Sequence, residues 1–256
     1  MPETVLGVIP ARFASRRFEG KPLADLGGKP LIQHVYERSA ACAVLERVVV
    51  ATDDERIRAT VERFGGAVAM TSSDHVSGTD RVAEVAAAES AAIVVNIQGD
   101  EPFVNARVLE QVVRPLLEPT APPMATLCKR ITERAVLEDP NVVKVVTASD
   151  GTALYFSRSP IPYPDRGVDA AAWEHIGIYA YRRDFLLAFS RMRPTQLELA
   201  EGLEQLRALE HGHRIAVVQT DDHVGVSVDT PDDLRRAQEM LEQIAAAPAR
   251  DALGRD

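Results

Sequence analysis

The chain has 256 residues, of which 46% are hydrophobic and 26% are charged, and its formal net charge is -9. This composition is ordinary for a globular protein, and the length suits one large α/β domain or two small ones. The acidic balance counts against general binding to nucleic acid or to an acidic membrane, because no basic excess is present to displace counterions from phosphates. A small anionic substrate would therefore need a local cluster of basic residues.

The cellular location is suggested by features that the sequence lacks. Cys42 and Cys128 are far apart and form neither a CxxC pair nor a disulfide framework, which favours a reducing compartment. The first residues carry a short apolar run with no basic segment before it, so no signal peptide is expected. No apolar run approaches the roughly 20 residues that span a bilayer. We therefore expect a cytoplasmic protein.

Apolar runs and amphipathic segments alternate along the first half of the chain. Strands are predicted at the apolar runs, residues 5–9, 47–52, 67–70 and 92–98. Helices are predicted at the amphipathic segments, residues 30–44, 53–65, 77–90 and 105–117. This alternation predicts right-handed βαβ units on a parallel sheet. The strand runs are apolar throughout, as in sheets that are covered on both faces.

The second half of the chain is less regular. Strands are predicted at residues 124–131, 142–149, 153–159, 175–183 and 214–220. Helices are predicted at 184–192 and 197–212, and a last helix starts at Pro231 with Thr230 as its cap. Several strands have no helix between them, which predicts a mixed sheet or an antiparallel subdomain. We expect a single domain over residues 1–246, with an insertion at about 120–215 and a frayed tail over 247–256.

A basic loop follows the first predicted strand. It carries the cations Arg12, Arg16, Arg17 and Lys21 around Gly20, on a chain whose net charge is negative. Arginine offers a fork of donors and lysine a point charge, so the loop suits a polyphosphate. A solvated basic loop is the alternative. Neither GxxxxGK[ST] nor GxGxxG occurs, which counts against a P-loop enzyme and a dinucleotide-dependent dehydrogenase.

Two adjacent carboxylates, Asp100 and Glu101, follow the strand predicted at 92–98, within the segment GDEP. Carboxylates close to a polyphosphate repel it unless a cation lies between them, and Mg²⁺ bound by one or two carboxylates, phosphate oxygens and water would serve. The alternative is a simple turn or helix cap. Asp229 also ends a predicted strand, but sequence spacing does not show that Asp100 and Asp229 meet.

Several segments together resemble the family of 3-deoxy-manno-octulosonate cytidylyltransferases, also called CMP-Kdo synthetases, where Kdo is the sugar acid. They stand in the family's order and cover almost the whole chain: IPARFASRRFEGKPL, SGTDR, NIQGDEP, DPNVVKVV, ALYFSRSPIP, HIGIYAYRR, LEQLRALEHG and VDTPDDL. The resemblance implies a Rossmann-like, three-layer α/β sandwich with a mostly parallel central sheet and a smaller mixed or antiparallel subdomain. Residues 120–215 would form that subdomain, at the sugar site and at the interface of a homodimer.

The resemblance also implies the reaction and the nucleotide site. The family joins CTP to Kdo, giving CMP-Kdo and pyrophosphate for lipopolysaccharide biosynthesis. Arg12, Arg17 and Lys21 would hold the triphosphate, and Asp100 and Asp229 would bind Mg²⁺; of these, Arg12, Lys21, Asp100 and Asp229 would be catalytic. The other residues expected beside the nucleotide are Ser77, Gly78, Thr79, Arg81 and, near the cytosine or ribose, Gln98.

The sugar site is expected in the irregular half of the chain. By the resemblance, Arg158 pairs with the carboxylate of Kdo, and His175 and Gln205 donate to sugar oxygens. Each residue has an alternative role. Arg158 could close an internal ion pair, His175 could be a structural histidine, and Gln205 could lie on the exposed face of a helix.

Two other functions remain open at this point. A related enzyme could act on another acidic sugar or on an amino-substituted Kdo. A nucleotide-binding regulator could keep the fold without turnover, although the presence of Lys21, Asp100 and Asp229 argues against it.

The basic loop departs from the family's usual pattern in its middle. The family usually reads RYASTRLPGKPL, whereas this chain has Arg16 in place of threonine and Phe18-Glu19 in place of Leu-Pro. Losing the proline frees the loop backbone, and Glu19 adds a negative charge beside the expected triphosphate site. We expect weaker triphosphate binding than in a TRLPGK version.

Replacing Phe18-Glu19 with Leu-Pro is therefore expected to lower the KM for CTP, because the loop becomes stiffer and loses a negative charge. Steady-state kinetics with varied CTP measures this. An unchanged or higher KM would contradict the expectation.

Overall fold

The computed structural model describes residues 3–14, 17–118, 120–163, 171–223 and 225–246. Its first half contains the predicted parallel strands, in the spatial order β6-β1-β4-β5. These strands are β1 (Val5–Ala11), β4 (Arg47–Thr52), β5 (Val68–Met70) and β6 (Ile93–Asn96). The helices that follow them are α1 (Leu31–Ala40), α2 (Glu55–Arg63), α3 (Gly78–Ala87) and α4 (Ala106–Val113).

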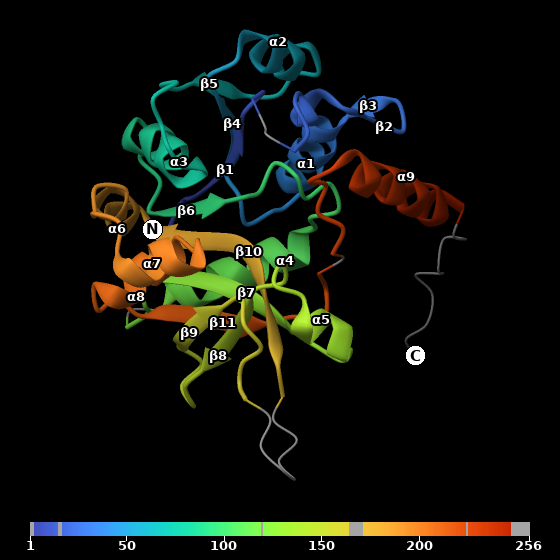
Figure 1. The fold of residues 1–256 in the computed structure, drawn as a ribbon. Coiled ribbons are helices and arrows are strands. Elements are labelled where there is room, and N and C mark those ends of the chain that lie inside the picture. The colour runs from blue at the N-terminus through green and yellow to red at the C-terminus, as the bar shows by residue number, and fades with distance from the viewer. Residues whose placement is uncertain (1–2, 15–16, 119, 164–170, 224, 247–256) are drawn as a thin grey trace, which may run out of the picture.

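The second half adds strands to the same sheet. The long β10 (Trp173–Arg182) lies antiparallel between β6 and β7 (Met124–Arg130), and β11 (Ile215–Gln219) runs parallel to β7 at the edge. The antiparallel pair β8 (Lys144–Thr147) and β9 (Ala153–Ser157) joins the start of β10. The prediction of a mostly parallel sheet with a smaller antiparallel part is thus confirmed (Figure 1).

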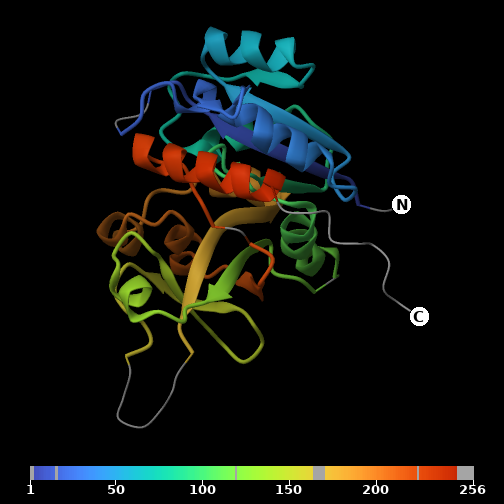
Figure 2. The same ribbon diagram turned by 90° about the vertical axis from the view of Figure 1, so that its right-hand side faces the viewer.

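Hydrophobic clusters fill both faces of the sheet. Along β1 the side chains alternate, so that Val5 and Ile9 enter one cluster while Leu6 and Val8 enter the other. The first cluster is covered by α1, α2 and α4, and the second by α3, α6 (Arg183–Phe189) and α8 (Gln205–Glu210). Figures 1 and 2 show the helices on either side of the sheet. The predicted three-layer α/β sandwich is confirmed.

Several predicted helices have different bounds in the structure. The helix expected at 197–212 is two helices, α7 (Gln196–Glu201) and α8, because Gly202 adopts a left-handed backbone (φ 64°) and ends α7. The helix expected from Pro30 begins at Leu31, with Pro30 as its N-cap in extended geometry. The helix expected at 105–117 is α4 followed by η2 (Arg114–Leu117), and the second half also contains the short helix α5 (Arg134–Glu138).

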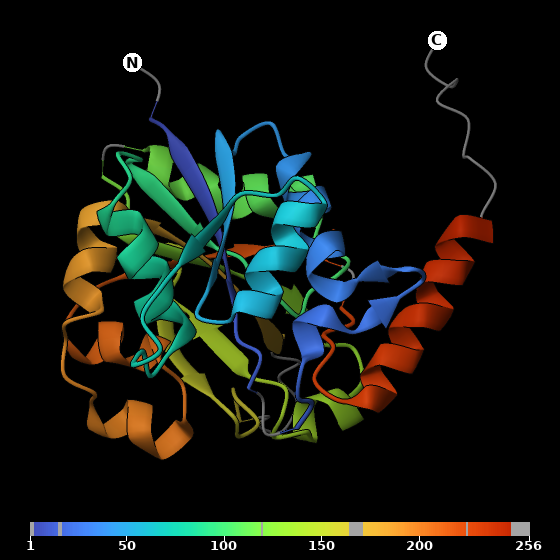
Figure 3. The ribbon, with the colours of Figure 1, turned by 90° about the horizontal axis from the view of Figure 1, so that it is seen from above.

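The C-terminal helix α9 (Pro231–Ala246) packs away from the main sheet, against a small hairpin of β2 (Asp25–Leu26) and β3 (Lys29–Pro30). Figure 3 shows the helix beside the hairpin. A third hydrophobic cluster joins them, built on the fully buried Leu26 and on Val228 and Ala237, which flank the start of α9. This small core connects the C-terminal segment to the chain that follows the basic loop.

Removing the centre of this third cluster is expected to loosen α9 selectively. Leu26→Ala should lower the free energy of unfolding by about 2–4 kcal/mol, because the side chain is fully buried. Amide hydrogen exchange should quicken in α9 and the hairpin more than in the central sheet. Leu117→Ala, at a half-exposed position, is the control and should change stability by less than about 0.5 kcal/mol. Unchanged exchange in α9 would show that the cluster does not hold the helix.

Candidate nucleotide and metal site

The basic loop is closed by a glycine turn. Gly20 has a left-handed backbone (φ 71°), and its N–H donates to the carbonyl of Phe13 at 2.9 Å. This turn ends in the short helix η1 (Lys21–Leu23), which places Lys21 as its first residue. The loop therefore fixes the backbone of Lys21 near the carboxyl end of β1. Arg16 lies outside the described residues.

The segment after β6 lies beside the end of β1. Gly99 approaches the carbonyl oxygen of Pro10 so closely that a Cβ atom at this position would lie 2.9 Å from it. Glycine is required here because a side chain would push the two loops apart. Asp100 follows at once, so its carboxylate starts from the same edge of the sheet as the basic loop. Ligands of open α/β sheets bind at this edge.

Asp229 reaches this edge from the far end of the chain. The N–H of Val228 donates to the carbonyl of Asp100 at 2.9 Å, which ties the two segments together. The cap of α9 is formed by Thr230 and Asp233: each donates its N–H to the other's side chain, and Asp233 also accepts from the N–H of Asp229. The carboxylate of Asp229 is therefore not needed for capping.

Lys21 contacts both carboxylates. Its Nζ lies 2.8 Å from Oδ2 of Asp100 and 3.2 Å from Oδ1 of Asp229, and Arg17 contacts Oδ2 of Asp229 at 3.1 Å. Burial alone would favour the neutral amine, but Asp100 and Asp229 outweigh it and raise the pKa of Lys21. The structure thus brings together Arg17, Lys21, Asp100 and Asp229, which the sequence could only propose as neighbours.

A pocket of about 280 Å³ opens beside this cluster. The end of β1, the basic loop, the start of α3 and the segment after β6 form its walls. Among the predicted site residues it is lined by Arg12, Lys21, Gly78, Gln98 and Asp100. A basic side, an acidic end and backbone groups between them suit a magnesium-bound polyphosphate.

The carboxylate pair fits the expected Mg²⁺. Both side chains offer hard oxygen ligands, and both reach the same ammonium nitrogen, so one cation can contact both. Among the described residues no group of three or more His, Cys, Asp or Glu side chains could hold a metal. Two carboxylates suffice for Mg²⁺ when phosphate oxygens and water complete its octahedron.

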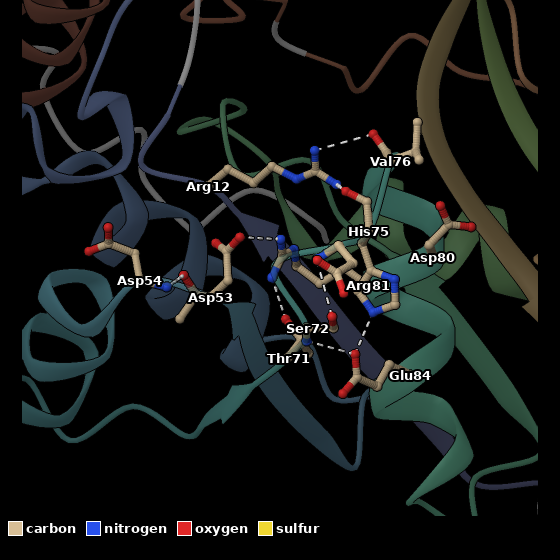
Figure 4. A network of polar contacts seen from close by, with 12 residues as sticks. Arg12, Asp53, Asp54, Thr71, Ser72, His75, Val76, Asp80, Arg81 and Glu84 are labelled. Carbon is tan, nitrogen blue, oxygen red and sulfur yellow. Dashed lines mark hydrogen bonds and ion pairs between the residues drawn. The ribbon is translucent and has the colours of Figure 1, made fainter.

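Arg12 and Arg81 belong to a polar network around the loop before α3 (Figure 4). Arg12 donates to the carbonyls of His75, Val76 and Ser77. The fully buried Arg81 donates to Asp53 at 2.9 Å and to Thr71. Both guanidinium groups therefore brace this loop, and Arg12 also lines the pocket.

The start of α3 positions three more predicted residues. Ser77 caps the helix in a capping box with Asp80, and Gly78 faces the pocket. The hydroxyl of Thr79 donates to Glu204 at the start of α8. Thr79 thus points away from the pocket toward the second half of the chain.

Comparison with known proteins gives the family. A family model described as cytidylyltransferase matches residues 6–215. The 3-deoxy-manno-octulosonate cytidylyltransferases of Geobacter sulfurreducens and Solibacter usitatus are 52% and 51% identical to this chain, covering 93% and 94% of it and 99% and 96% of their own lengths. This chain belongs to the 3-deoxy-manno-octulosonate cytidylyltransferase family.

Solved structures agree. A CMP:2-keto-3-deoxy-manno-octonic acid synthetase complexed with CTP has a TM-score of 0.90 and 45% identity, covering 94% of this chain and 99% of its own. A 4-diphosphocytidyl-2C-methyl-D-erythritol synthase from Anaerococcus prevotii, with a TM-score of 0.62 and 11% identity, covers 94% of this chain and 100% of its own and shows the shared fold alone.

In this cytidylyltransferase, Gln98 connects the pocket to the second half of the chain, because its Nε2 donates to the carbonyl of Gly177 at 2.9 Å. His175, two residues earlier on β10, lies with Nε2 3.0 Å from the hydroxyl of Thr126, and burial lowers the pKa of His175 to about 3. The imidazole is therefore neutral at physiological pH.

The guanidinium of Arg158 is held by two carbonyls, Glu201 at 2.8 Å and Pro140 at 3.0 Å. A guanidinium has five N–H donors, so these two bonds leave capacity for a carboxylate ligand. Within the described ranges, the contacts of this guanidinium are not the internal ion pair considered from sequence, since both acceptors are neutral carbonyl oxygens.

Gln205 is buried rather than on an exposed helix face, and Glu204 beside it escaped the sequence analysis. Among the described residues, Nε2 of Gln205 has no hydrogen-bond partner, and Oε1 of Glu204 accepts no hydrogen bond, although it lies 3.6 Å from Nη2 of Arg207 in an ion pair. Buried polar atoms without partners mark a place where a polar ligand is expected. The start of α3 connects Glu204 to the pocket, because Thr79 donates to Glu204 and the adjacent Gly78 lines the pocket. The only signal in the sequence for Glu204 as a site residue was its position next to Gln205.

Glu101, the second carboxylate of GDEP, is largely buried beside His223 and away from Lys21. Burial, and then the charge of Asp100, raise the pKa of Glu101 to about 8. The two adjacent carboxyl groups therefore differ: Asp100 contacts Lys21 of the basic loop, and Glu101 is held as an acid near neutral pH.

Proposed function

We propose that this chain transfers the cytidylyl group of CTP to Kdo, giving CMP-Kdo and pyrophosphate, in the supply of lipopolysaccharide precursors. The single observation that carries the proposal is the shared contact of Lys21 with Asp100 and Asp229 at the mouth of the pocket. The identity to named relatives over nearly the whole chain supports the choice of CTP and Kdo.

The reaction forms a bond between the anomeric oxygen of Kdo and the α-phosphorus of CTP, and it breaks the bond from that phosphorus to the β-phosphate oxygen. Such a transfer depends on positioning and on neutralising charge. Arg17 and Lys21 supply cations on the triphosphate side, and Gly78 and Gln98 shape the pocket. Mg²⁺, held by Asp100 and Asp229, would neutralise phosphate charge and favour ionisation of the sugar hydroxyl.

The sugar acid is expected on the far side of Gln98. The sugar side has four polar groups from β9, β10, α8 or the segments next to them: the guanidinium of Arg158, the neutral His175, the half-buried Glu204 and the buried Gln205. Arg158 would pair with the Kdo carboxylate, and Oε1 of Glu204 and Nε2 of Gln205, which make no hydrogen bond within the described residues, would bind sugar hydroxyls. Gln98 connects the residues expected around the nucleotide to those expected around the sugar, because it donates to the carbonyl of Gly177.

The surface of the second half supports a homodimer. Large apolar side chains are exposed at Leu154 of β9 and at Leu197 and Leu199 of α7. The strand and the helix are neighbours, because Ser157 donates to Glu201 at 2.7 Å. Exposed apolar groups on adjacent elements favour an interface, and we include a homodimer in the proposal. Light scattering should give about twice the 27.9 kDa mass of one chain, and a monomeric mass would contradict the dimer.

A cytoplasmic location is also part of the proposal. Cys42 and Cys128 are both buried and free, as expected in a reducing compartment. Within the described ranges, no helix has both the length and the apolar character to cross a bilayer.

The decisive test is pyrophosphate release from a panel of nucleotides and sugar acids. We expect release with CTP and Kdo that requires Mg²⁺ and stops with EDTA. Asp100→Asn should lower kcat by about a hundredfold or more, since the carboxylate acts on developing phosphate charge. Its melting temperature should stay close to that of the wild type, because a carboxylate in an open cleft contributes little to stability.

Asp232→Asn is the matched control. Asp232 lies three residues after Asp229, and its side chain is exposed in an ion pair with Arg235, so its loss should leave turnover unchanged. Full activity of Asp100→Asn would show that the metal assignment is wrong. Release with an amino-substituted Kdo but not with Kdo would move the proposal to the related enzyme. CTP binding without turnover on any sugar acid would point to a regulator.

A further inference from the structure

The ion cluster leaves little of the metal site open to a bare cation. Asp229 gives one carboxylate oxygen to Lys21 and the other to Arg17, and Asp100 gives Oδ2 to Lys21. Three of the four carboxylate oxygens therefore contact a cationic side chain. A divalent metal that uses both carboxylates has to compete with Lys21 for the same oxygens.

The charges of the cluster are already balanced. Two carboxylates face one ammonium and one guanidinium, and the ammonium is well shielded, with 15% of the Lys21 side chain exposed. Adding a divalent cation would leave an excess of two positive charges in a partly buried site, which is unfavourable. A triphosphate would remove this excess and would also offer Lys21 and Arg17 new partners.

The geometry allows Lys21 to change partners without a change of fold. Its backbone is fixed in η1 by the bonds from Gly20 to Phe13 and from Leu23 to Gly20. Its side chain lines the pocket as well as contacting the carboxylates. Rotation about the four side-chain bonds of lysine is enough to move the ammonium from the carboxylates into the pocket.

We infer that Lys21 acts as a tethered counter-ion that keeps divalent metal off Asp100 and Asp229 until a nucleoside triphosphate draws its ammonium into the pocket. Metal and nucleotide then bind cooperatively, since each strengthens the binding of the other by the same factor. This inference rests on the proposed function for the identity of the nucleotide. The enzyme thereby selects the metal–nucleotide complex over the free metal.

The test uses Mn²⁺ alone, with no nucleotide and no sugar, and measures free Mn²⁺ by electron paramagnetic resonance. We expect weak binding to the wild type and affinity about tenfold or more higher in Lys21→Met, because the competing cation is gone. Lys21→Gln, which keeps a polar group of similar length, should also bind Mn²⁺ more tightly than the wild type. It serves as the second variant if Lys21→Met does not fold.

Two further variants assign the effect to this site. Lys29→Met removes an exposed lysine whose Nζ pairs with Glu37 at 2.6 Å, and it should bind Mn²⁺ as the wild type does. The double variant Lys21→Met/Asp100→Asn should lose the gain in affinity. Equal or weaker Mn²⁺ binding by both folded Lys21 variants would overturn the inference, as would an equal gain in Lys29→Met. Because no substrate is used, this result is independent of whether CTP and Kdo are the true substrates.

Discussion

The contact of one lysine with two aspartates joins three distant parts of the chain. Lys21 is separated from Asp100 by 79 residues and from Asp229 by 208. Each segment is fixed by a different feature: a glycine turn before Lys21, the close approach of Gly99 to Pro10, and the capped start of α9 after Asp229. The site depends on these three features meeting at one edge of the sheet. Its charges balance only when all of them are in place.

The third hydrophobic cluster explains why the C-terminal helix belongs to the site. Asp229 precedes α9, and the body of that helix packs on the hairpin that follows Lys21. The same small core thus positions both the lysine and one of its aspartates. A loss of packing in this cluster would change the distance between the charges of Lys21 and Asp229. This links apolar packing to the electrostatics of the pocket.

Much of the first half could be predicted because its signals are local. Apolar runs marked β1, β4, β5 and β6. In the second half, Thr230 caps the last helix where the sequence indicated. The pairing of β10 between β6 and β7 could not be read, since it is a long-range contact with no local signal. Gly202 is a possible signal for the break between α7 and α8. Isolated glycines are also tolerated within helices, so this residue alone did not predict the break.

Charged residue types were found more reliably than their roles. Arg12 and Arg81 stood out as cations near an expected nucleotide, yet Arg81 is buried against Asp53 and Thr71. Burial depends on packing by α3 and its neighbours, which sequence spacing does not give. Glu204 was missed for the same reason. Its place beside α3 becomes visible only when the start of α8 is placed against that helix.

The departure at Phe18-Glu19 has a structural meaning that the sequence could not supply. Phe18 packs against the third hydrophobic cluster, whereas Glu19 is exposed. An apolar residue at position 18 thus keeps the packing that the family's usual leucine can also provide, so the first half of the departure is conservative. The replacement of proline by Glu19 changes the charge and the backbone freedom of the loop without changing the hydrophobic core. Any effect on the triphosphate therefore comes from Glu19, through the loop that sets the position of Lys21.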